Sequence, residues 1–454
     1  STQYGEKWAS MWLDLARYAD TKGYESDGGR QIWQYRDWVI RAFNADKPYD
    51  QFLTEQIAGD LLPDPTDAQY IATAFSRNSM SNDEGGTDNE EFRTAAVMDR
   101  VSTTWEALMG TTFACVQCHS HPYDPFRHDE YYKFLAYYNN TRDEDIPADY
   151  PLLREFNDSA KLKLQEVLQW VGTHASQEQV KKTELFLRTW QPSINSSTVD
   201  SMNQFAVIGN GNTSLLFRNG GTARLKHVDL TNVGQFIWNF YSNKKNGTLR
   251  LHLDNPAGPV LVSIPITGRD NWRIESSSFA GVQGIHDVYL VYDNPTLPAK
   301  EKDDFTVVFD WMAFMPQFPG QGTAGYEGIK NSFWSLVTAK VPTTPVMVEN
   351  PADMWRASHV FERGNRRTLG KEVKPGVPAS LSFAMPANAP QNRLGLSMWL
   401  TNKQNPLVSR TIINRLWEQL FGTGIAETLE DMGTQGIPPT HKELLDHLGI
   451  KFKF

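Results

Sequence analysis

Residues 201–318 differ in residue composition and pattern from the rest of this 454-residue chain. The block consists of short runs rich in β-branched and aromatic residues, such as "GQFIWNFYSN", "TLRLHLDN", "HDVYLVYDN" and "FTVVFDWMAF". Apolar and polar residues alternate within the runs, and Asn, Gly, Pro and Asp separate them, which is typical of β-strands joined by turns. The regular spacing of the runs predicts a β-sandwich of the jelly-roll kind.

Helical patterns flank this block on both sides. In "EKWASMWLDLARYAD" the apolar side chains recur three and four residues apart, and "IWQYRDWVIRAFN" repeats the pattern. The stretch "PYDQFLTEQIAGDLL" begins with Pro48 and ends before Pro63, as a short helix should. Near the other end, "NPLVSRTIINRLWEQLF" carries an apolar stripe formed by Val408, Ile412, Leu416 and Leu420.

These strand-like and helix-like patterns predict a multidomain α + β fold with five parts. We expect a mainly helical domain, a helical hairpin that acts as a connector, the β-sandwich, a linker rich in Pro, Gly and Thr, and a second helical part that packs back on the first domain and continues beyond this chain. The corresponding boundaries are 1–150, 151–200, 201–318, 319–354 and 355–454.

The charge and hydropathy of the chain exclude two classes of partner. The net charge is −9 and there is no dense Lys/Arg patch, so the chain has no electrostatic reason to follow a phosphate backbone, and we expect no nucleic acid. No apolar run approaches the ~20 residues that span a bilayer, so we expect no transmembrane span.

Both cysteines lie in one C-x-x-C-H motif, formed by Cys115, Cys118 and His119. In covalent haem attachment each thiol adds across one vinyl group, and the adjacent imidazole binds the iron as the proximal ligand. A thiolate-rich zinc site usually takes two C-x-x-C pairs, and a thioredoxin-like disulfide needs a βαβ context. The sequence has neither. The motif therefore favours haem c, with zinc, a disulfide and two unrelated buried cysteines as the alternatives.

The sixth ligand of such an iron distinguishes electron transfer from small-molecule binding. His121 follows His119 by two residues and is too close to reach the opposite face of the same iron. An open sixth position would favour catalysis, and a filled one would favour electron transfer. The candidate distal ligands are Met80, His128, His359 and His441.

Two acidic clusters, in "NDEGGTDNEEFR" and "NNTRDEDIPAD", flank the motif. Carboxylates beside glycine turns can hold calcium, and a close carboxylate pair can act as general acid and base. The alternative is helix caps and salt bridges to Arg93, Arg100 and Arg142, because neither cluster has EF-hand spacing. The candidate calcium ligands are Asp83, Glu84, Glu90, Glu91, Asp143 and Asp145.

Several long stretches carry a family resemblance. "YGEKWASMWLDLARYADTKGYE", "NDEGGTDNEEFR" and "CVQCHSHPYDPFRHDEYYKFLAYYNNT" resemble the planctomycete-type cytochrome-domain proteins, which are also widespread in Bacteroidota. That family carries two domains of unknown function around the haem motif, and "NRLGLSMWLTNKQNPLVSRTIINRLWEQLFGTGI" is similar to the second. The resemblance covers residues 1–150 and 355–454, and it implies a haem c attached at the C-x-x-C-H motif of a bacterial, most simply a Bacteroidota, protein.

The middle block is similar to a family-6 carbohydrate-binding module. The stretches that match are "VDLTNVGQFIWNFYSNKKNGTLRLHLDNPAGPVLVSIPITGRDNW" and "GIHDVYLVYDN". Such modules stack a sugar on aromatic side chains, often on one just before the position of Asn271, where this chain has Arg269 and Asp270. Trp272 is the candidate glycan-binding residue, and we expect Trp311 to lie in the core.

Together these features predict an extracytoplasmic c-type haem protein for electron transfer or redox chemistry, linked to polysaccharide utilisation. Haem is attached outside the cytoplasm, so we expect the periplasm or the bacterial cell surface, with the export signal or anchor outside this chain. The expected partners are a redox protein or other subunits of a surface complex, and a glycan. The alternatives are an enzyme that oxidises or hydrolyses polysaccharide and a glycan-binding scaffold, so whether the chain is an enzyme stays open.

Overall fold

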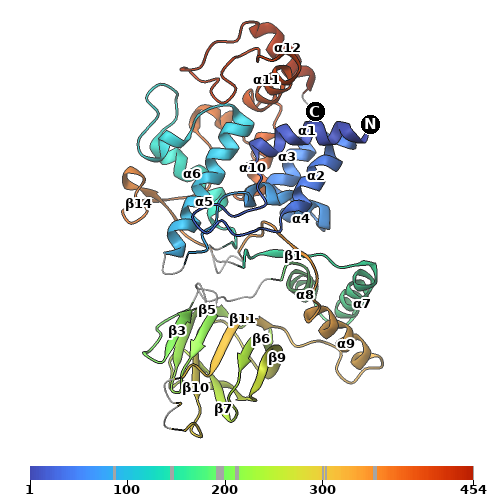
Figure 1. Ribbon diagram of the computed structural model, residues 1–454, viewed down its shortest axis with the longest axis vertical. Coiled ribbons are helices and arrows are strands. Elements are labelled where there is room, and N and C mark those ends of the chain that lie inside the picture. Colours follow the sequence, from blue (N-terminus) through green and yellow to red (C-terminus); the bar gives the residue numbers. More distant parts are fainter. Residues whose placement is uncertain are drawn as a thin grey trace. The chain divides into compact units, whose positions relative to one another are not determined.

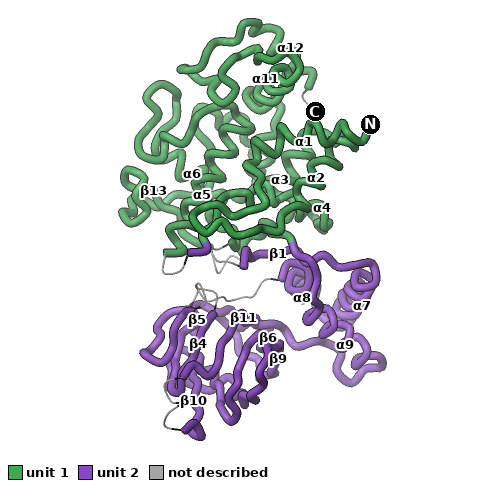
Figure 2. The backbone as a smooth tube through the Cα atoms, in the orientation of Figure 1, with its two compact units in different colours: residues 1–82, 88–145, 344–454 green, residues 83–87, 146–343 purple. Residues whose placement is uncertain are grey.

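The computed structural model describes residues 1–84, 88–143, 148–190, 199–209, 214–298, 301, 304–350 and 355–452. The chain forms two compact units (Figures 1 and 2). Unit 1 contains residues 1–82, 88–145 and 344–454, and unit 2 contains residues 83–87 and 146–343. The predicted α + β class is confirmed, because unit 1 is mainly helical and unit 2 contains the two five-stranded antiparallel sheets.

The helices in the first part of unit 1 form where the apolar periodicity predicts them. A buried hydrogen-bond network joins the first three helices. The Trp12 indole and the Tyr35 hydroxyl both donate to Gln56 Oε1, at 2.8 and 2.7 Å. The helices are α1 (Thr2–Leu15), α2 (Trp33–Asn44), α3 (Tyr49–Ala58), α4 (Asp67–Ala72), α5 (Asn89–Thr104) and α6 (His128–Asn139).

The last part of the sequence folds into the same unit. It contributes the hairpin β13 (Ser358–Phe361) and β14 (Leu369–Val373), and the helices α10 (Arg393–Leu400), α11 (Leu407–Phe421) and α12 (Lys442–Phe452). The Trp399 ring of α10 lies 6.0 Å from Phe134 of α6 and 6.2 Å from Trp105. Of the apolar stripe on α11, Val408 and Ile412 are buried, whereas Leu420 is 65% exposed on the last turn.

Unit 2 contains the predicted β-sandwich, built from two five-stranded antiparallel sheets in the orders β2-β5-β10-β7-β8 and β3-β4-β11-β6-β9. Phe236, Trp238 and Phe240 of β6 alternate into the space between the sheets. The strands are β2 (Val199–Asp200), β3 (Ala206–Gly209), β4 (Ser214–Phe217), β5 (Thr222–Asp229), β6 (Val233–Ser242), β7 (Gly247–Leu253), β8 (Val260–Ile266), β9 (Arg269–Val282), β10 (Ile285–Asp293) and β11 (Val307–Met315).

Three helices cover the outer face of the second sheet, beside the strands in Figure 1. They are α7 (Asp158–His174), α8 (Gln177–Thr189) and α9 (Tyr326–Val337). Their apolar residues pack on Ile237 of β6 and on Trp311 of β11, which is 3% exposed and lies in the core as expected.

The hairpin of α7 and α8 is thus part of unit 2 and packs directly on the sheet. The interpretation of residues 319–354 as a linker was wrong over α9, which buries Phe333, Leu336 and Val337. The Pro and Gly residues that suggested a linker lie mainly on either side of this amphipathic helix, and Gly325, at its N-cap, has a φ of +87°. Among the described residues, no helix has the length and apolarity needed to cross a membrane.

Candidate functional site

The C-x-x-C-H motif lies on a short turn of unit 1 between α5 and α6. Residues Ala114–Gln117 form a 3-10 helix, and the Cys118 N–H donates to the Cys115 carbonyl at 3.3 Å, which closes the turn. Both thiols are free and exposed. Val116, between them, is fully buried, so it anchors the turn while the two sulfur atoms and His119 face outward.

The aromatic residues below the turn hold it in place. Trp105, in the π-helical turn Trp105–Met109, stacks on Phe113 with 4.1 Å between ring centroids. On α6, the Tyr132 hydroxyl donates to the Gln117 carbonyl at 2.7 Å, and His128 Nε2 lies 3.0 Å from the same oxygen. The backbone of the motif is therefore fixed from the core side, which leaves its side chains available on the surface.

His119 shows the arrangement that a metal-binding imidazole needs. Its Nδ1 lies 2.8 Å from the Ser120 carbonyl oxygen. Because a carbonyl oxygen only accepts, Nδ1 carries the proton in the neutral ring and Nε2 keeps its lone pair. Iron-binding and zinc-binding histidines are oriented in this way, by a hydrogen bond from the second ring nitrogen.

Cys118 lies against the turn between β13 and β14. Gly364, in that turn, has a φ of +77°, and a Cβ atom there would be 3.0 Å from Cys118 Sγ and 3.5 Å from the Gln117 carbonyl oxygen. The absence of a side chain at residue 364 therefore keeps space open beside this thiol. The ring of Phe361, at the end of β13, lies 5.0 Å from that of Tyr132, so the hairpin packs on α6 next to the motif.

Cys115 has an acidic environment. Partial burial, followed by the negative charges of Asp124 and Asp431, raises the pKa of the Cys115 thiol. Reactive redox dithiols and thiolate metal ligands need the opposite, a lowered pKa. Within the described part of the chain, no three His, Cys, Asp or Glu side chains gather where they could hold a metal ion, so no further ligands join the cysteines into a zinc site.

Of the candidate distal ligands, His128 is the one that hydrogen-bonds to the motif in the described residues, and its Nε2 is already engaged with Gln117. His359 lies on β13 with its Nδ1 3.2 Å from the Gly370 carbonyl oxygen. His441 lies before α12 with its Nδ1 3.1 Å from Thr440 Oγ1. Met80 is 52% exposed and lies against Gly23.

In the acidic clusters, caps and ion pairs involve Asp88, Glu90, Glu91 and Asp143. Glu90 makes a bidentate pair with Arg93 at 2.7 and 2.8 Å, and Glu91 pairs with Arg366 at 3.1 Å. Asp88, next to them, caps α5 through the Glu90 N–H. Asp83 and Glu84 group with unit 2, whereas Glu90, Glu91 and Asp143 belong to unit 1, and Asp145 lies outside the described residues.

The Asp143 carboxylate forms ion pairs with arginine side chains. It is buried and accepts from Arg100 Nη1 and Nη2 at 3.1 and 2.6 Å, with Arg77 3.9 Å away. Burial alone would raise the pKa of Asp143, but the two guanidinium groups outweigh burial and hold the pKa well below its usual range. These contacts correspond to the salt-bridge alternative for the acidic clusters.

On the sandwich, Trp272 is 47% exposed near the start of β9. Its ring lies 6.1 Å from that of Tyr241, on the neighbouring strand β6, at an angle of 48°. The Tyr241 hydroxyl donates to the carboxylate of Asp270. An exposed tryptophan with a half-buried tyrosine and a carboxylate beside it can stack on one face of a sugar ring and bond to its hydroxyl groups.

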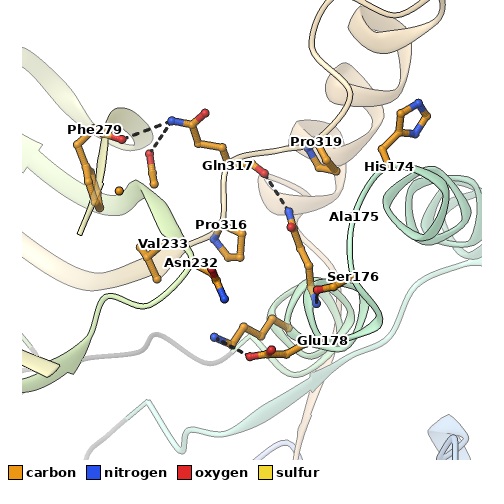
Figure 3. Close-up of a pocket in the computed structure, with 14 residues that line it drawn as sticks. His174, Ala175, Ser176, Glu178, Asn232, Val233, Phe279, Pro316, Gln317 and Pro319 are labelled. Atoms are coloured by element: carbon orange, nitrogen blue, oxygen red, sulfur yellow. Dashed lines mark hydrogen bonds and ion pairs between the residues drawn. The ribbon is translucent and has the colours of Figure 1, made fainter. Parts of the chain in front are cut away.

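A cleft of about 630 Å³ lies within unit 2, at the other ends of β6 and β9, between the sheet and the start of α8 (Figure 3). The Gln179 side chain donates to the Gln317 carbonyl at 2.9 Å, and the Gln317 amide donates to the Gly234 and Phe279 carbonyls at 3.2 and 3.4 Å. Glu178 and Lys182 form an ion pair of 3.5 Å at the rim. These polar groups bond largely to one another, so they join the helical hairpin to the sheet.

Sequence reasoning missed the residues that surround the motif, namely Asp124, Gly364 and Asp431. Asp124 could have been identified from the sequence, because it lies in "HPYDPF", directly after the motif. Gly364 and Asp431 lie more than two hundred residues along the chain, and no local pattern connects them to the cysteines.

Three family models match parts of the chain. Residues 1–143 match PSCyt2, "Protein of unknown function (DUF1549)", residues 392–453 match PSD1, "Protein of unknown function (DUF1553)", and residues 193–314 match "Carbohydrate binding module (family 6)". These matches confirm the resemblance to two domains of unknown function around a carbohydrate-binding module. The comparison with curated proteins gives no match.

Solved structures are similar to the sandwich region. A family 6 module from Clostridium cellulolyticum in complex with xylose is 21% identical, over 27% of this chain and 94% of that chain, with a TM-score of 0.23. A module from Clostridium stercorarium in complex with cellobiose is 20% identical, over 27% and 92%, with a TM-score of 0.23. A β-1,3-glucan binding module from Bacillus halodurans is 16% identical, over 27% and 93%, with a TM-score of 0.23. The chain therefore combines segments that match two domain families of unknown function with a β-sandwich similar to family 6 carbohydrate-binding modules.

Proposed function

We propose that this chain is a c-type haem protein that acts outside the cytoplasm in electron transfer or redox chemistry. The family 6 match of residues 193–314 supports a polysaccharide-related role. The redox part of the proposal rests on one observation. The two cysteines are free and exposed one turn apart, and His119 next to them has its Nδ1 engaged with a carbonyl oxygen.

These residues fit a covalent haem. Cys115 and Cys118 would each add S–H across a vinyl group, which forms an S–C bond and transfers the thiol hydrogen to the other vinyl carbon, with no oxidant needed. His119 would bind through Nε2, and the missing side chain of Gly364 leaves space beside Cys118. When bound, a haem supplies one-electron chemistry at its iron.

A pyridine haemochrome spectrum of protein exported to the periplasm of a host with c-type haem maturation tests this function. We expect a c-type spectrum and a haem stain at the mass of the chain on a denaturing gel. Both should be lost in the Cys115→Ser, Cys118→Ser double variant. A wild-type protein without covalent haem under these conditions would overturn the proposal.

Glycan binding is a second candidate function, and the exposed Trp272 with Tyr241 and Asp270 beside it favours it. The pair offers an apolar face and hydrogen-bonding groups on the surface of a rigid sheet. Affinity electrophoresis in gels that contain soluble polysaccharides tests this function, because retarded migration reports binding directly.

The proposed cellular location and partners follow from haem attachment and glycan binding together. Covalent haem attachment takes place outside the cytoplasm, so we place the protein in the periplasm or at the bacterial cell surface. Its partners would be a redox protein or other subunits of a surface complex, with a glycan bound at the sandwich.

A further inference from the structure

A cavity of about 320 Å³ lies within unit 1, between α5, α6 and the β13–β14 hairpin with the residues that lead into it. Ligand pockets usually measure ~300–1,000 Å³, so this cavity has the size for one small molecule. Residues 90–97 and 135–139 form one side of it, and residues 356–369 form the other. The cavity therefore exists only when the last part of the sequence packs on the first.

The cavity is lined by more positive than negative side chains. Among its described lining residues there are three guanidinium groups and one carboxylate, which are Arg93, Arg356, Arg366 and Glu90. Partial burial acts against ionisation of Glu90, but the three arginines together hold the pKa of this carboxyl below its usual range. All three positive charges therefore act on the same side of the cavity, where Glu90 meets the buried Arg93.

Hydrogen bonds fix the polar wall in place. Arg356 Nη1 donates to the Thr141 carbonyl at 2.8 Å and to the Asn139 carbonyl at 3.4 Å. The Asn139 side chain accepts from Arg93 Nη2 at 3.0 Å and donates to Ser358 Oγ at 3.0 Å. A wall that is already ordered loses little conformational entropy when a ligand binds, which favours affinity.

Arg366 brings a positive charge from the hairpin side. Its Nη2 pairs with Asp88 and, at 3.1 Å, with Glu91, and neither of these acidic residues lines the cavity. Their side chains are 48% and 55% exposed, whereas that of Arg366 is 19% exposed. Solvent screens exposed carboxylates, so the two pairs neutralise Arg366 only in part. Both pairs use Nη2, so Nε and Nη1 remain for an oxyanion as far as the described residues show.

The rest of the lining is suited to a ring that carries hydroxyl groups. Ser358 and His359 line the cavity and can form hydrogen bonds with hydroxyls. Apolar side chains complete the wall, namely Val97, Leu135, Phe361 and Leu369. An inorganic ion would use only the arginines, whereas an anionic sugar would use the arginines, the hydrogen-bonding groups and the apolar wall.

We infer that this cavity binds a sugar that carries an oxyanion group, either a carboxylate, as in a uronate, or a sulfate ester. Arg356 and Arg366 would bind the oxyanion, and the ring would lie on the apolar wall. The inference rests on the polysaccharide-related part of the proposed function and requires no haem. The site also differs from the one proposed at Trp272, because the cavity belongs to unit 1 and Trp272 to unit 2.

Isothermal titration calorimetry at low ionic strength tests the site, with glucuronate, galacturonate, a sulfated glucose, glucose and sodium sulfate as probes. We expect one site per chain for a charged sugar, and affinity for uncharged glucose that is about 10-fold lower or less. The order of the uronates and the sulfated sugar shows which oxyanion fits, and either order supports the site. Equal affinity for glucose, or binding of inorganic sulfate alone as an adventitious ion only, would overturn it.

Two matched pairs of variants locate the binding. Arg366→Gln should lower the affinity about 10-fold or more, whereas Arg367→Gln, at the exposed neighbour that does not line the cavity, should bind as the wild type does. Ala357 lines the cavity at an exposed position. Ala357→Glu should therefore repel the charged sugar, and Ala357→Gln, of nearly the same size, should have a much smaller effect. Circular dichroism checks that each variant is folded.

Two further variants separate this site from the functions proposed above. Binding that persists in Trp272→Ala and in the Cys115→Ser, Cys118→Ser variant supports a site that needs neither the sandwich face nor haem. Binding that is lost in Trp272→Ala would place the charged sugar on the sandwich and contradict the inference. A folded wild type that binds none of the charged sugars contradicts it too, as do Arg366→Gln and Ala357→Glu variants with wild-type affinity.

Discussion

Arg393 of α10 and Asp60, just after α3, form a bidentate ion pair in the core of unit 1, with N–O distances of 2.8 and 2.6 Å. The guanidinium is fully buried, and it also donates to the Ile57 carbonyl at 2.9 Å. The two residues are 333 positions apart, so this pair attaches the last part of the sequence to the first.

Removing one partner of this pair should destabilise unit 1 strongly. We expect Arg393→Met to lower the free energy of unfolding by about 3–5 kcal/mol, because Asp60 would remain buried and uncompensated. Urea denaturation measures the change. The double variant Asp60→Asn, Arg393→Met should recover part of the loss, and Arg367→Ala, at a side chain 72% exposed, should leave stability nearly unchanged. An Arg393→Met protein as stable as the wild type contradicts this role.

Gly364→Ala should impair haem attachment. The added methyl would crowd Cys118 Sγ, and we expect several-fold less haem per chain by haem stain and mass spectrometry. Gly422→Ala is the matched control, because Gly422 has a φ of +82°, close to the +77° of Gly364, and nothing lies within 4 Å of the added carbon. The two variants share the backbone strain of a left-handed alanine, about 1 kcal/mol. Equal haem loading in both would show that the space beside Cys118 is not needed.

The stability of unit 1 should decrease in acid through Asp143. A carboxyl group whose pKa is lower in the folded state stabilises the fold above its unfolded pKa, and this stabilisation disappears as the pH falls toward the folded pKa. Asp143 has a folded pKa well below the usual 3.8, so the loss should begin as the pH falls below about 4.

Urea denaturation at pH 7, 4 and 2.5 checks this expectation. Asp143→Asn should be less stable than the wild type by about 3 kcal/mol or more at pH 7, because Arg100 and Arg77 lose their buried partner. The difference should shrink at pH 2.5. Asp64→Asn, at an exposed position in the same unit, is the control. A difference that is constant with pH would mean that Asp143 acts through packing and not through its charge.

Trp272→Ala should abolish most glycan binding if the sandwich binds polysaccharide. Loss of one stacking aromatic should weaken binding at least 10-fold in affinity electrophoresis with xylan, cello-oligosaccharides and β-1,3-glucan as probes. Tyr241→Phe, which keeps the ring and removes the hydroxyl that bonds to Asp270, should have a smaller effect.

The control for this measurement is Trp33→Ala, at a tryptophan 40% exposed in unit 1. It should migrate as the wild type does. If Trp272→Ala and the wild type are retarded equally, binding does not involve this face of the sandwich, and the cleft at the other ends of β6 and β9 becomes the surface to test by Lys182→Ala.

The secondary structure was predictable wherever burial on one face imposed a period on the sequence. Helices α1, α2 and α3 and strands β6, β7, β10 and β11 carry such periods. Strand β9 was missed although it has 14 residues, because it pairs only with β6 at the edge of its sheet and leaves most of its polar side chains exposed.

The sequence by itself determined the local chemistry of the site. The order of Cys115, Cys118 and His119 places two thiols and an imidazole on one turn, since neighbours in the chain are neighbours in space. Only the tertiary structure decided what surrounds that turn. Gly364 lies beside the turn, and the charge of Asp431 acts on Cys115. Arg393 lies in the core of the same unit. All three come from positions far from the motif along the chain. Such contacts depend on how helices and loops pack, and packing leaves no pattern in the sequence near the motif.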